Sequence, residues 1–505
     1  MLGATLREAA RRFGDQPAYV APDGWPLSFV FLDRASDEVA MGLTHRGIGP
    51  GDVVALVLPP GPEYLVAYLA AAKIGAITAG VNDRLTDAER VAVLDLAGPR
   101  LVLAPPGTAP ATYDAVEVTR ADTAGAVLGD LRIKGVPEPL ESDPGRPVAI
   151  VFTSGTTGIP KGALYCNRQL SFITSVDVGP AWGAGGRGFT GTSFAHLGFM
   201  TKLAGNLQRG GTSFIMERWR ARDSLALLER ERMQTVAGVP TQLALMLREP
   251  DFEAFNLASV EFIIVGGGPV TPGLAQEARE RFDARLATRY SCTEAGIGLG
   301  TGFDDPDEDA VISVGRPHVA VELGVFDDAD RPVAEGEVGA VCLRSPAVMT
   351  GYWHDPDATR AAFTADGFVR TGDLGWVDEQ GRLRLVGRSK EMYVRGGYNV
   401  YPVEVEAVLS THPDVAHVAV VPGPDPVMGE VGIAFVVARD AAAAPTIDGL
   451  REFGRDRLAA YKLPEGLRIV DALPLTAGEK VDRRALRVAL DRDSSNGDSA
   501  AGQPA

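Results

Sequence analysis

Hydrophobic and polar residues alternate along residues 1–145 in two different rhythms. Segments 6–13 and 63–75 repeat apolar residues at helical spacing, whereas segments 53–58 and 101–104 are short apolar runs typical of buried strands. Strands that alternate with helices indicate a parallel sheet with helices on its faces. The same alternation returns between residues 212 and 290, which predicts further parallel-type structure.

The pattern changes after about residue 310. Residues 310–387 contain short segments of period-two alternation with frequent glycines, which predict a small antiparallel β-barrel or sheet. Residues 389–491 alternate between strand and helix patterns again, and residues 492–505 are polar and small. We therefore expect an α/β protein with a large N-terminal domain (1–388) of two parallel-type α/β sheets plus a small antiparallel β-barrel, a smaller α+β C-terminal domain (389–491) and a disordered tail (492–505).

Length, charge and cysteines narrow the class of protein. A chain of 505 residues exceeds what one hydrophobic core normally holds. The net charge of −17, with no Lys/Arg-rich block, argues against binding to nucleic acid or to an anionic membrane. Three widely spaced cysteines indicate neither a disulfide framework nor a zinc site, which fits a reducing, cytoplasmic location. The most membrane-like segment, 64–81, is interrupted by Lys73 and two glycines, so we expect a buried helix and strand there rather than a membrane span.

A loop rich in glycine and hydroxyls follows the apolar run 148–152. The loop TSGTTGIPKG (153–162) combines hydroxyl donors, backbone N–H groups at glycines and one mobile positive charge, at Thr153, Ser154, Gly155, Thr156, Thr157, Gly158 and Lys161. This composition suits a polyphosphate at the end of a strand, where open α/β sheets bind ligands. The P-loop of NTPases does not fit, because Pro160 precedes the lysine and Gly162 follows it. A plain surface loop is the alternative.

Further polar clusters follow later strands. The glycines of GGGP (266–269) would let a flat ligand lie against the backbone. Glu294, at the end of the strand that leads into YSCTE (290–294), is a candidate oxygen ligand for Mg²⁺. Asp373 in RTGDL (370–374) is either a turn former or a carboxylate that binds ribose hydroxyls. His196 is either a core residue bonded to backbone or part of a pocket wall.

The ordered set TSGTTGIPKG, GGGP, YSCTE, RTGDL, GRSKE, RGGYNVYP and PLTAGEK resembles the adenylate-forming superfamily of acyl- and aryl-CoA synthetases, luciferases and adenylation domains. The resemblance covers essentially the whole chain and is closest in type to acyl-CoA synthetases. It implies ATP-dependent activation of a small-molecule carboxylic acid to an acyl-adenylate with release of pyrophosphate. Transfer to coenzyme A then gives a thioester and AMP, with ATP, Mg²⁺ and coenzyme A as the expected cofactors.

The resemblance also implies roles for individual residues. The loop 153–161 would hold the β- and γ-phosphates, Thr293 and Glu294 would contact the α-phosphate and Mg²⁺, and Lys480 would act in the first step. Adenine and ribose would be bound by Gly267, Gly268, Pro269, Tyr290, Asp373 and Arg388. His196 would line the acyl pocket. The mobile C-terminal domain would rotate about Lys390, which withdraws Lys480 and presents the loop of Gly396 and Gly397 to the thiol.

One departure and several alternatives remain. The last motif usually has glycine directly before its lysine, whereas here Glu479 adjoins Lys480 and could offset its charge. The segment near Phe194 lacks an aspartate that would bind an α-amino group, which argues against an amino acid substrate. Lys202 is either a solvated surface charge or a partner for a second acidic group. The alternatives in function are a stand-alone adenylating enzyme that delivers to an acyl carrier protein or another nucleophile, including nitrite activation for diazotisation, and a non-catalytic nucleotide-binding regulator.

Overall fold

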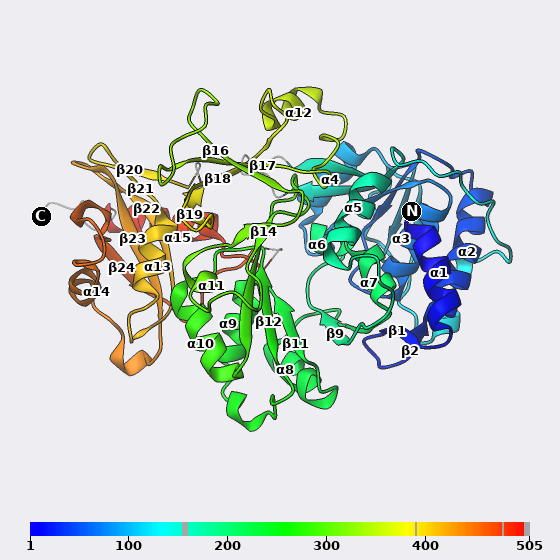
Figure 1. Cartoon of the computed structure of the whole chain (residues 1–505), viewed down its shortest axis with the longest axis horizontal. Coiled ribbons are helices and arrows are strands. Elements are labelled where there is room, and N and C mark those ends of the chain that lie inside the picture. The colour runs from blue at the N-terminus through cyan, green and yellow to red at the C-terminus, as the bar shows by residue number, and fades with distance from the viewer. Residues whose placement is uncertain (154–159, 389–390, 477–478, 499–505) are drawn as a thin grey trace, which may run out of the picture.

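The computed structural model describes residues 1–153, 160–388, 391–476 and 479–498. These residues form five β-sheets flanked by helices (Figure 1). The C-terminal sheet lies at one end of the molecule and the N-terminal six-stranded sheet at the other (Figure 1). Short 3₁₀ helices occur in the connections, at Ala124–Ala126, Gly129–Leu131, Phe252–Ala254, Ala441–Ala443 and Ala460–Lys462.

The first large sheet has the strand order β6-β5-β3-β4-β7-β8. Its strands are Ala115–Glu117 (β6), Leu101–Ala104 (β5), Val53–Leu56 (β3), Ile77–Gly80 (β4), Pro147–Thr153 (β7) and Lys161–Cys166 (β8). All neighbours are parallel except β7 and β8, which form an antiparallel pair. The accompanying helices are Leu2–Phe13 (α1), Phe29–His45 (α2), Pro62–Lys73 (α3), Asp87–Ala97 (α4) and Asn167–Asp177 (α5). The predicted phosphate loop therefore connects two adjacent strands.

The membrane-like segment 64–81 forms the buried helix α3 and the buried strand β4, as predicted. Lys73 is tolerated in this core because its Nζ forms ion pairs with Asp33 Oδ1 at 2.6 Å and Asp37 Oδ1 at 2.7 Å. Across the described residues, we find no helix that is both long and apolar enough to cross a membrane.

The second large sheet has the order β11-β12-β13-β14-β15, and its first three strands are parallel. Its strands are Thr235–Gly238 (β11), Phe262–Gly266 (β12), Arg285–Tyr290 (β13), Leu299–Gly300 (β14) and Arg316–Pro317 (β15). The helices around it are Ala221–Arg230 (α8), Pro240–Leu247 (α9), Pro272–Phe282 (α10) and Asp309–Ile312 (α11). Both parallel-type sheets of the prediction are thus confirmed.

A third sheet, with the order β2-β1-β10-β9, joins segments far apart in the sequence. It consists of Pro17–Val20 (β1), Pro26–Ser28 (β2), Arg187–Thr190 (β9) and Thr212–Ile215 (β10), and the helices Leu197–Met200 (α6) and Leu203–Arg209 (α7) lie between its last two strands in sequence. Strand β10 pairs in parallel with β1 and β9 rather than with the second large sheet. No local sequence pattern predicts this sheet, because its strands pair across long separations in the chain.

Residues 322–388 form an antiparallel sheet in the order β16-β17-β18-β19. The strands are Glu322–Phe326 (β16), Gly339–Arg344 (β17), Val369–Val377 (β18) and Leu383–Arg388 (β19), and the helix Pro356–Ala362 (α12) lies between β17 and β18 in sequence. The predicted antiparallel structure is confirmed, whereas its closure into a barrel stays a prediction.

The C-terminal region has a sheet of its own, in the order β21-β20-β23-β22, with β24 added beside β23. Its elements are Tyr393–Arg395 (β20), Tyr398–Val400 (β21), Pro402–Leu409 (α13), Val415–Asp425 (β22), Gly429–Ala438 (β23), Ile447–Gly454 (α14), Gly466–Ile469 (β24) and Arg483–Asp498 (α15). A separate apolar cluster that includes Tyr393 and Val436 packs beneath it. Helix α15 extends into the segment predicted as a disordered tail, and the boundary at 388/389 stays a prediction.

Candidate functional site

A cleft of about 3120 Å³ lies among the large sheets, the antiparallel sheet and the C-terminal region. It is bordered by the ends of β7, β12 and β13, by β18 and β19, and by the segment around Lys480. Pockets for one small molecule usually measure about 300–1,000 Å³. This cleft is therefore larger than a pocket for one small molecule.

Asp373 anchors a buried polar cluster on one wall of the cleft. The antiparallel register of β18 and β19 places Asp373 opposite Arg388. Arg388 Nε donates to Asp373 Oδ1 at 3.0 Å, and Tyr290 Oη donates to Oδ2 at 2.7 Å. RTGDL lies within strand β18 and not in a turn, although Gly372 has a φ of 78°. The turn-former interpretation of Asp373 is therefore wrong, because its side chain faces two partners from other strands.

Glu294 and Lys161 both contact Tyr352, a residue that belongs to none of the sequence motifs. Tyr352 Oη donates to Glu294 Oε1 at 2.7 Å, and Lys161 Nζ lies 5.0 Å from the centre of the Tyr352 ring. Burial, followed by the charge of Glu294, raises the pKa of Tyr352, so its hydroxyl remains a donor. No local sequence pattern predicts this role for Tyr352, because it lies in the loop after β17 and only the tertiary structure brings it to Glu294.

Two neighbours of this group are also fixed. Thr153 ends β7 directly opposite Lys161 at the start of β8. The backbone oxygen of Thr293 accepts a hydrogen bond from Tyr165 Oη at 2.5 Å. The intervening loop residues Ser154, Gly155, Thr156, Thr157 and Gly158 lie outside the described residues, as does Lys390.

The segment directly after β12 borders the same cleft through Gly267, Gly268 and Pro269. Gly267 has a φ of 82°, which favours glycine. A Cβ at the preceding Gly266 would lie 2.4 Å from the backbone oxygen of Arg289. The absence of a side chain at Gly266 therefore allows β12 to lie close to β13 where both strands border the cleft.

His196 lies at the start of helix α6 and also lines the cleft. Asn82 Nδ2 lies 3.0 Å from His196 Nε2, and Arg84 donates its backbone N–H to Asn82 Oδ1 at 3.0 Å. Burial lowers the pKa of His196 to about 4, and the charges of Lys480 and Arg84 contribute. The imidazole is therefore neutral at neutral pH and accepts from Asn82 at Nε2. This arrangement favours the pocket-wall interpretation.

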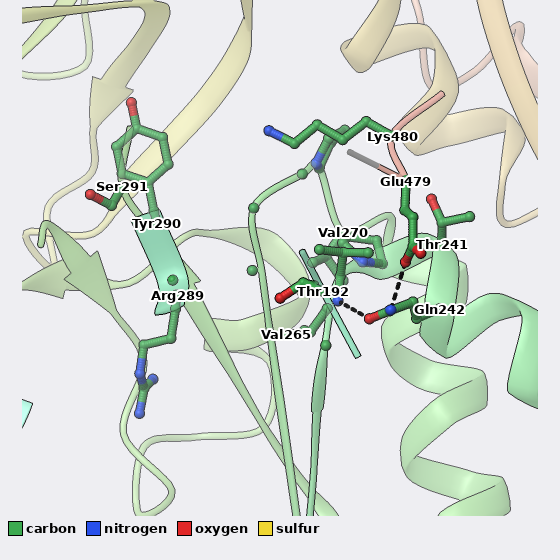
Figure 2. Close-up of a pocket in the computed structure, with 18 of the residues that line it drawn as sticks. Thr192, Thr241, Gln242, Val265, Val270, Arg289, Tyr290, Ser291, Glu479 and Lys480 are labelled. Carbon is green, nitrogen blue, oxygen red and sulfur yellow. Dashed lines mark hydrogen bonds between the residues drawn. The ribbon is translucent and has the colours of Figure 1, made fainter. Parts of the chain in front are cut away.

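Lys480 enters the cleft from the C-terminal region, and Figure 2 shows its side chain extended toward the side on which Tyr290 lies. Surrounding protein lowers the pKa of Lys480, Arg388 lowers it further, and Asp373 opposes the shift. The side chain still reaches solvent inside the open cleft. Lys480 thus borders the same cleft as site residues from both large sheets and from the antiparallel sheet.

Gly396 and Gly397 are not brought to this cleft. They form the exposed two-residue turn between β20 and β21, with φ angles of 54° and 87°. Such a turn needs positive φ at both central residues, which explains the pair of glycines. In this arrangement Lys480, and not the glycine turn, faces the other site residues.

Comparison with known proteins gives consistent matches over nearly the whole chain. The AMP-binding enzyme family matches residues 6–353, and the AMP-binding enzyme C-terminal domain matches residues 404–480. The 3-[(3aS,4S,7aS)-7a-methyl-1,5-dioxo-octahydro-1H-inden-4-yl]propanoyl:CoA ligase of Mycobacterium tuberculosis is 34% identical over 96% of this chain and 98% of its own. The fatty acid–[acyl-carrier-protein] ligase ScoC of Streptomyces coeruleorubidus is 32% identical over 92% of both chains.

A solved structure agrees with these matches. The amide bond synthetase McbA from Marinactinospora thermotolerans has a TM-score of 0.84 and 28% identity, over 97% of this chain and 99% of that one.

Proposed function

The chain belongs to the AMP-binding enzyme family, and from this premise we propose that it joins a carboxylic acid to coenzyme A in two steps driven by ATP. The observation that carries the proposal is the convergence of Lys480, His196, Glu294 and the Asp373 cluster on one cleft. Each of these residues comes from a different element, so a shared structural role does not explain their meeting.

In the first step the ionised acid attacks the α-phosphorus of ATP. An O–P bond forms between the carboxylate and the α-phosphate, and the bond to the bridging oxygen breaks to release pyrophosphate. A carboxylate is already ionised at neutral pH, so no general base is required. Negative charge spreads over phosphate oxygens, and fixed cations and donors stabilise it. Lys480 and Lys161 would supply those cations, and the neutral His196 would border the acid.

Asp373 is suited to ribose, because a carboxylate held by Arg388 and Tyr290 can accept hydrogen bonds from two vicinal hydroxyls. The segment Gly267, Gly268 and Pro269 after β12, together with Tyr290, would cover adenine. Both assignments rest on the resemblance and on the position of these residues at one wall of the cleft.

Mg²⁺ would be held by Glu294 and would neutralise charge on the phosphate oxygens. Within the described ranges no group of three His, Cys, Asp or Glu residues could hold a metal ion by itself. This donor set fits Mg²⁺, which commonly takes one or two carboxylates and completes its shell with substrate phosphates and water. Tyr352 engages Glu294 Oε1 and leaves Oε2 free of hydrogen-bond partners among the described residues.

In the second step a thiol attacks the acyl carbon and AMP leaves. We propose that Lys480 then withdraws and that the turn of Gly396 and Gly397 approaches, which requires rotation of the C-terminal domain about Lys390. Coenzyme A is the acceptor in the names of several relatives, including the feruloyl-CoA synthase of an Amycolatopsis species, which is 31% identical to this chain. An acyl carrier protein or an amine is the second candidate, favoured by the names of ScoC and McbA. A cytoplasmic location fits the three free cysteines.

The test is pyrophosphate release from ATP and Mg²⁺ across fatty, aryl, hydroxycinnamic and bicyclic propanoic acids and nitrite, each with and without coenzyme A. We expect release with one acid class, formation of its CoA thioester, and loss of both in Lys480→Ala. Product that appears only with a carrier protein or an amine would favour the second candidate. Silence across the panel despite ATP binding would refute the ligase and favour the regulator.

A further inference from the structure

Glu479 has a backbone conformation that is unfavourable for residues other than glycine. Its φ is 60°, in the left-handed region that glycine adopts without strain and other residues adopt rarely. The resembling motif has glycine directly before its lysine, so a glycine would fit this position without the strain. A side chain kept under these conditions needs compensating contacts, and the structure contains them.

Both carboxylate oxygens of Glu479 are bound by the N-terminal region. Oε1 accepts from Arg84 Nη1 at 2.8 Å, and Oε2 accepts from Gln242 Nε2 at 2.6 Å. The Glu479 side chain is only 15% exposed, which strengthens such charged hydrogen bonds. Figure 2 shows the side chain directed toward Gln242, whereas Lys480 extends in another direction. Glu479 therefore faces Arg84 and Gln242 and does not act as the counterion of its neighbour.

The two partners lie on different walls of the cleft. Arg84 follows β4 of the six-stranded sheet, and Gln242 lies on α9 beside the second large sheet. Gln242 Nε2 also donates to the backbone oxygen of Gly191 at 2.8 Å. The backbone N–H of Arg84 donates to Asn82, whose side-chain amide nitrogen in turn donates to His196. One carboxylate thus ties the segment that carries Lys480 to both walls and to the residue that borders the acid.

We propose that Glu479 is a positioning residue that holds Lys480 in the cleft for the first step and must release Arg84 and Gln242 before transfer to the acceptor. This inference rests on the proposed two-step function. It assigns to one residue control of the balance between the two half-reactions, because its bonds to Arg84 and Gln242 accompany the position of Lys480 in the cleft. Arg84 and Gln242 are the parts of the N-terminal region that receive it.

The first test separates the half-reactions in Glu479→Gln, Glu479→Gly and Arg84→Gln. Charged, partly buried hydrogen bonds of this kind predict a drop of about tenfold in pyrophosphate formation. Transfer from preloaded acyl-adenylate to coenzyme A should be unchanged or faster. Glu479→Gly also relieves the strained φ, so backbone strain does not explain its result. Glu452→Gln, which removes an exposed carboxylate paired with Arg455, is the control and should leave both rates unchanged.

Non-additivity checks the pair directly. The double variant Glu479→Gln/Arg84→Gln should be about as slow as either single variant, because the two side chains share one interaction. Faster pyrophosphate formation in Glu479→Gln would instead mean that the carboxylate offsets the charge of Lys480, and would overturn the proposal. Equal losses in both half-reactions, or fully additive losses in the double variant, would also overturn it.

A readout independent of activity separates this inference from the ligase proposal. Dyes attached through unnatural amino acids at Val319 and Val427, which are 83% and 86% exposed, report the distance between the N-terminal and C-terminal regions by energy transfer. We expect one dominant distance in wild-type protein without ligands and a second population in Glu479→Gln. Identical distributions would refute the positioning role even if ligase activity is found. A shifted distribution would support it even if the acid panel shows no pyrophosphate release.

Discussion

Tyr352→Phe is the substitution that most directly tests the geometry around Glu294. It removes one hydroxyl, which donates to Glu294 Oε1 at 2.7 Å, and keeps the ring beneath Lys161. Hydrogen bonds to charged groups contribute about 1.5–3 kcal/mol. Both side chains are half-buried at the edge of an open cleft, so we expect the lower end of this range. At about 1.4 kcal/mol per factor of ten, adenylation should slow by about tenfold.

The expected effect is specific to the first step, because Glu294 would bind Mg²⁺ with the nucleotide. Pyrophosphate release, measured against Mg²⁺ concentration at saturating acid, should require more Mg²⁺ for half-maximal rate in the variant. Transfer of a preloaded acyl-adenylate to coenzyme A should be nearly unchanged. The matched control is Tyr113→Phe, which removes a tyrosine hydroxyl that donates to Asp95 at the surface, outside the cleft.

A clear result would refute this reasoning. If Tyr352→Phe keeps the wild-type rate and the wild-type Mg²⁺ dependence, the hydroxyl does not orient the carboxylate. If Tyr113→Phe lowers the rate as much as Tyr352→Phe, the loss reflects general destabilisation. Unfolding midpoints of both variants, measured in parallel, distinguish these cases.

Three further predictions concern the nucleotide site and the C-terminal region. Asp373→Ala removes the shared acceptor of Arg388 and Tyr290 and should weaken ATP binding by about tenfold in calorimetry; unchanged affinity would contradict the ribose assignment. Burial, with help from nearby arginines, lowers the pKa of His417 to about 4. Between pH 6.5 and pH 4 the unfolded chain therefore binds a proton at His417 that the folded chain does not bind. The free energy of unfolding should fall by about 2 kcal/mol as the pH drops from 6.5 to 4. In His417→Gln, denaturant titrations should show a smaller decrease of the unfolding free energy over the same pH range. Glu406→Ala removes a buried carboxylate whose Oε1 lies 2.6 Å from Arg483 Nη1 and accepts from the Val420 N–H. It should cost about 3 kcal/mol in chemical denaturation, because among the described residues only Glu391, 3.2 Å from Arg483 Nε, remains as a charged partner. Glu404→Ala at a more exposed pair should cost little.

The segments whose pattern is local were predicted from the sequence. The helical spacing at residues 6–13 and 63–75 is confirmed by α1 and α3, and the apolar run 148–152 lies within β7. Helical or strand periodicity is a property of neighbouring residues, so it survives whatever the rest of the chain does. Polar residues at strand ends were also found, because parallel strands bring their carboxyl ends to one edge.

Other parts of the site depended on tertiary structure alone. Strand β1 pairs with β10 although nearly 200 residues separate them. Tyr352, in the loop after β17, donates to Glu294, which follows β13 of another sheet. From the sequence, Glu479 is only an unusual neighbour that could offset the charge of Lys480. In the structure its carboxylate instead binds Arg84 and Gln242. Sequence determines which residue types stand at the ends of strands. The order of the sheets and the docking of the C-terminal region determine which of those residues come within 3 Å of one another.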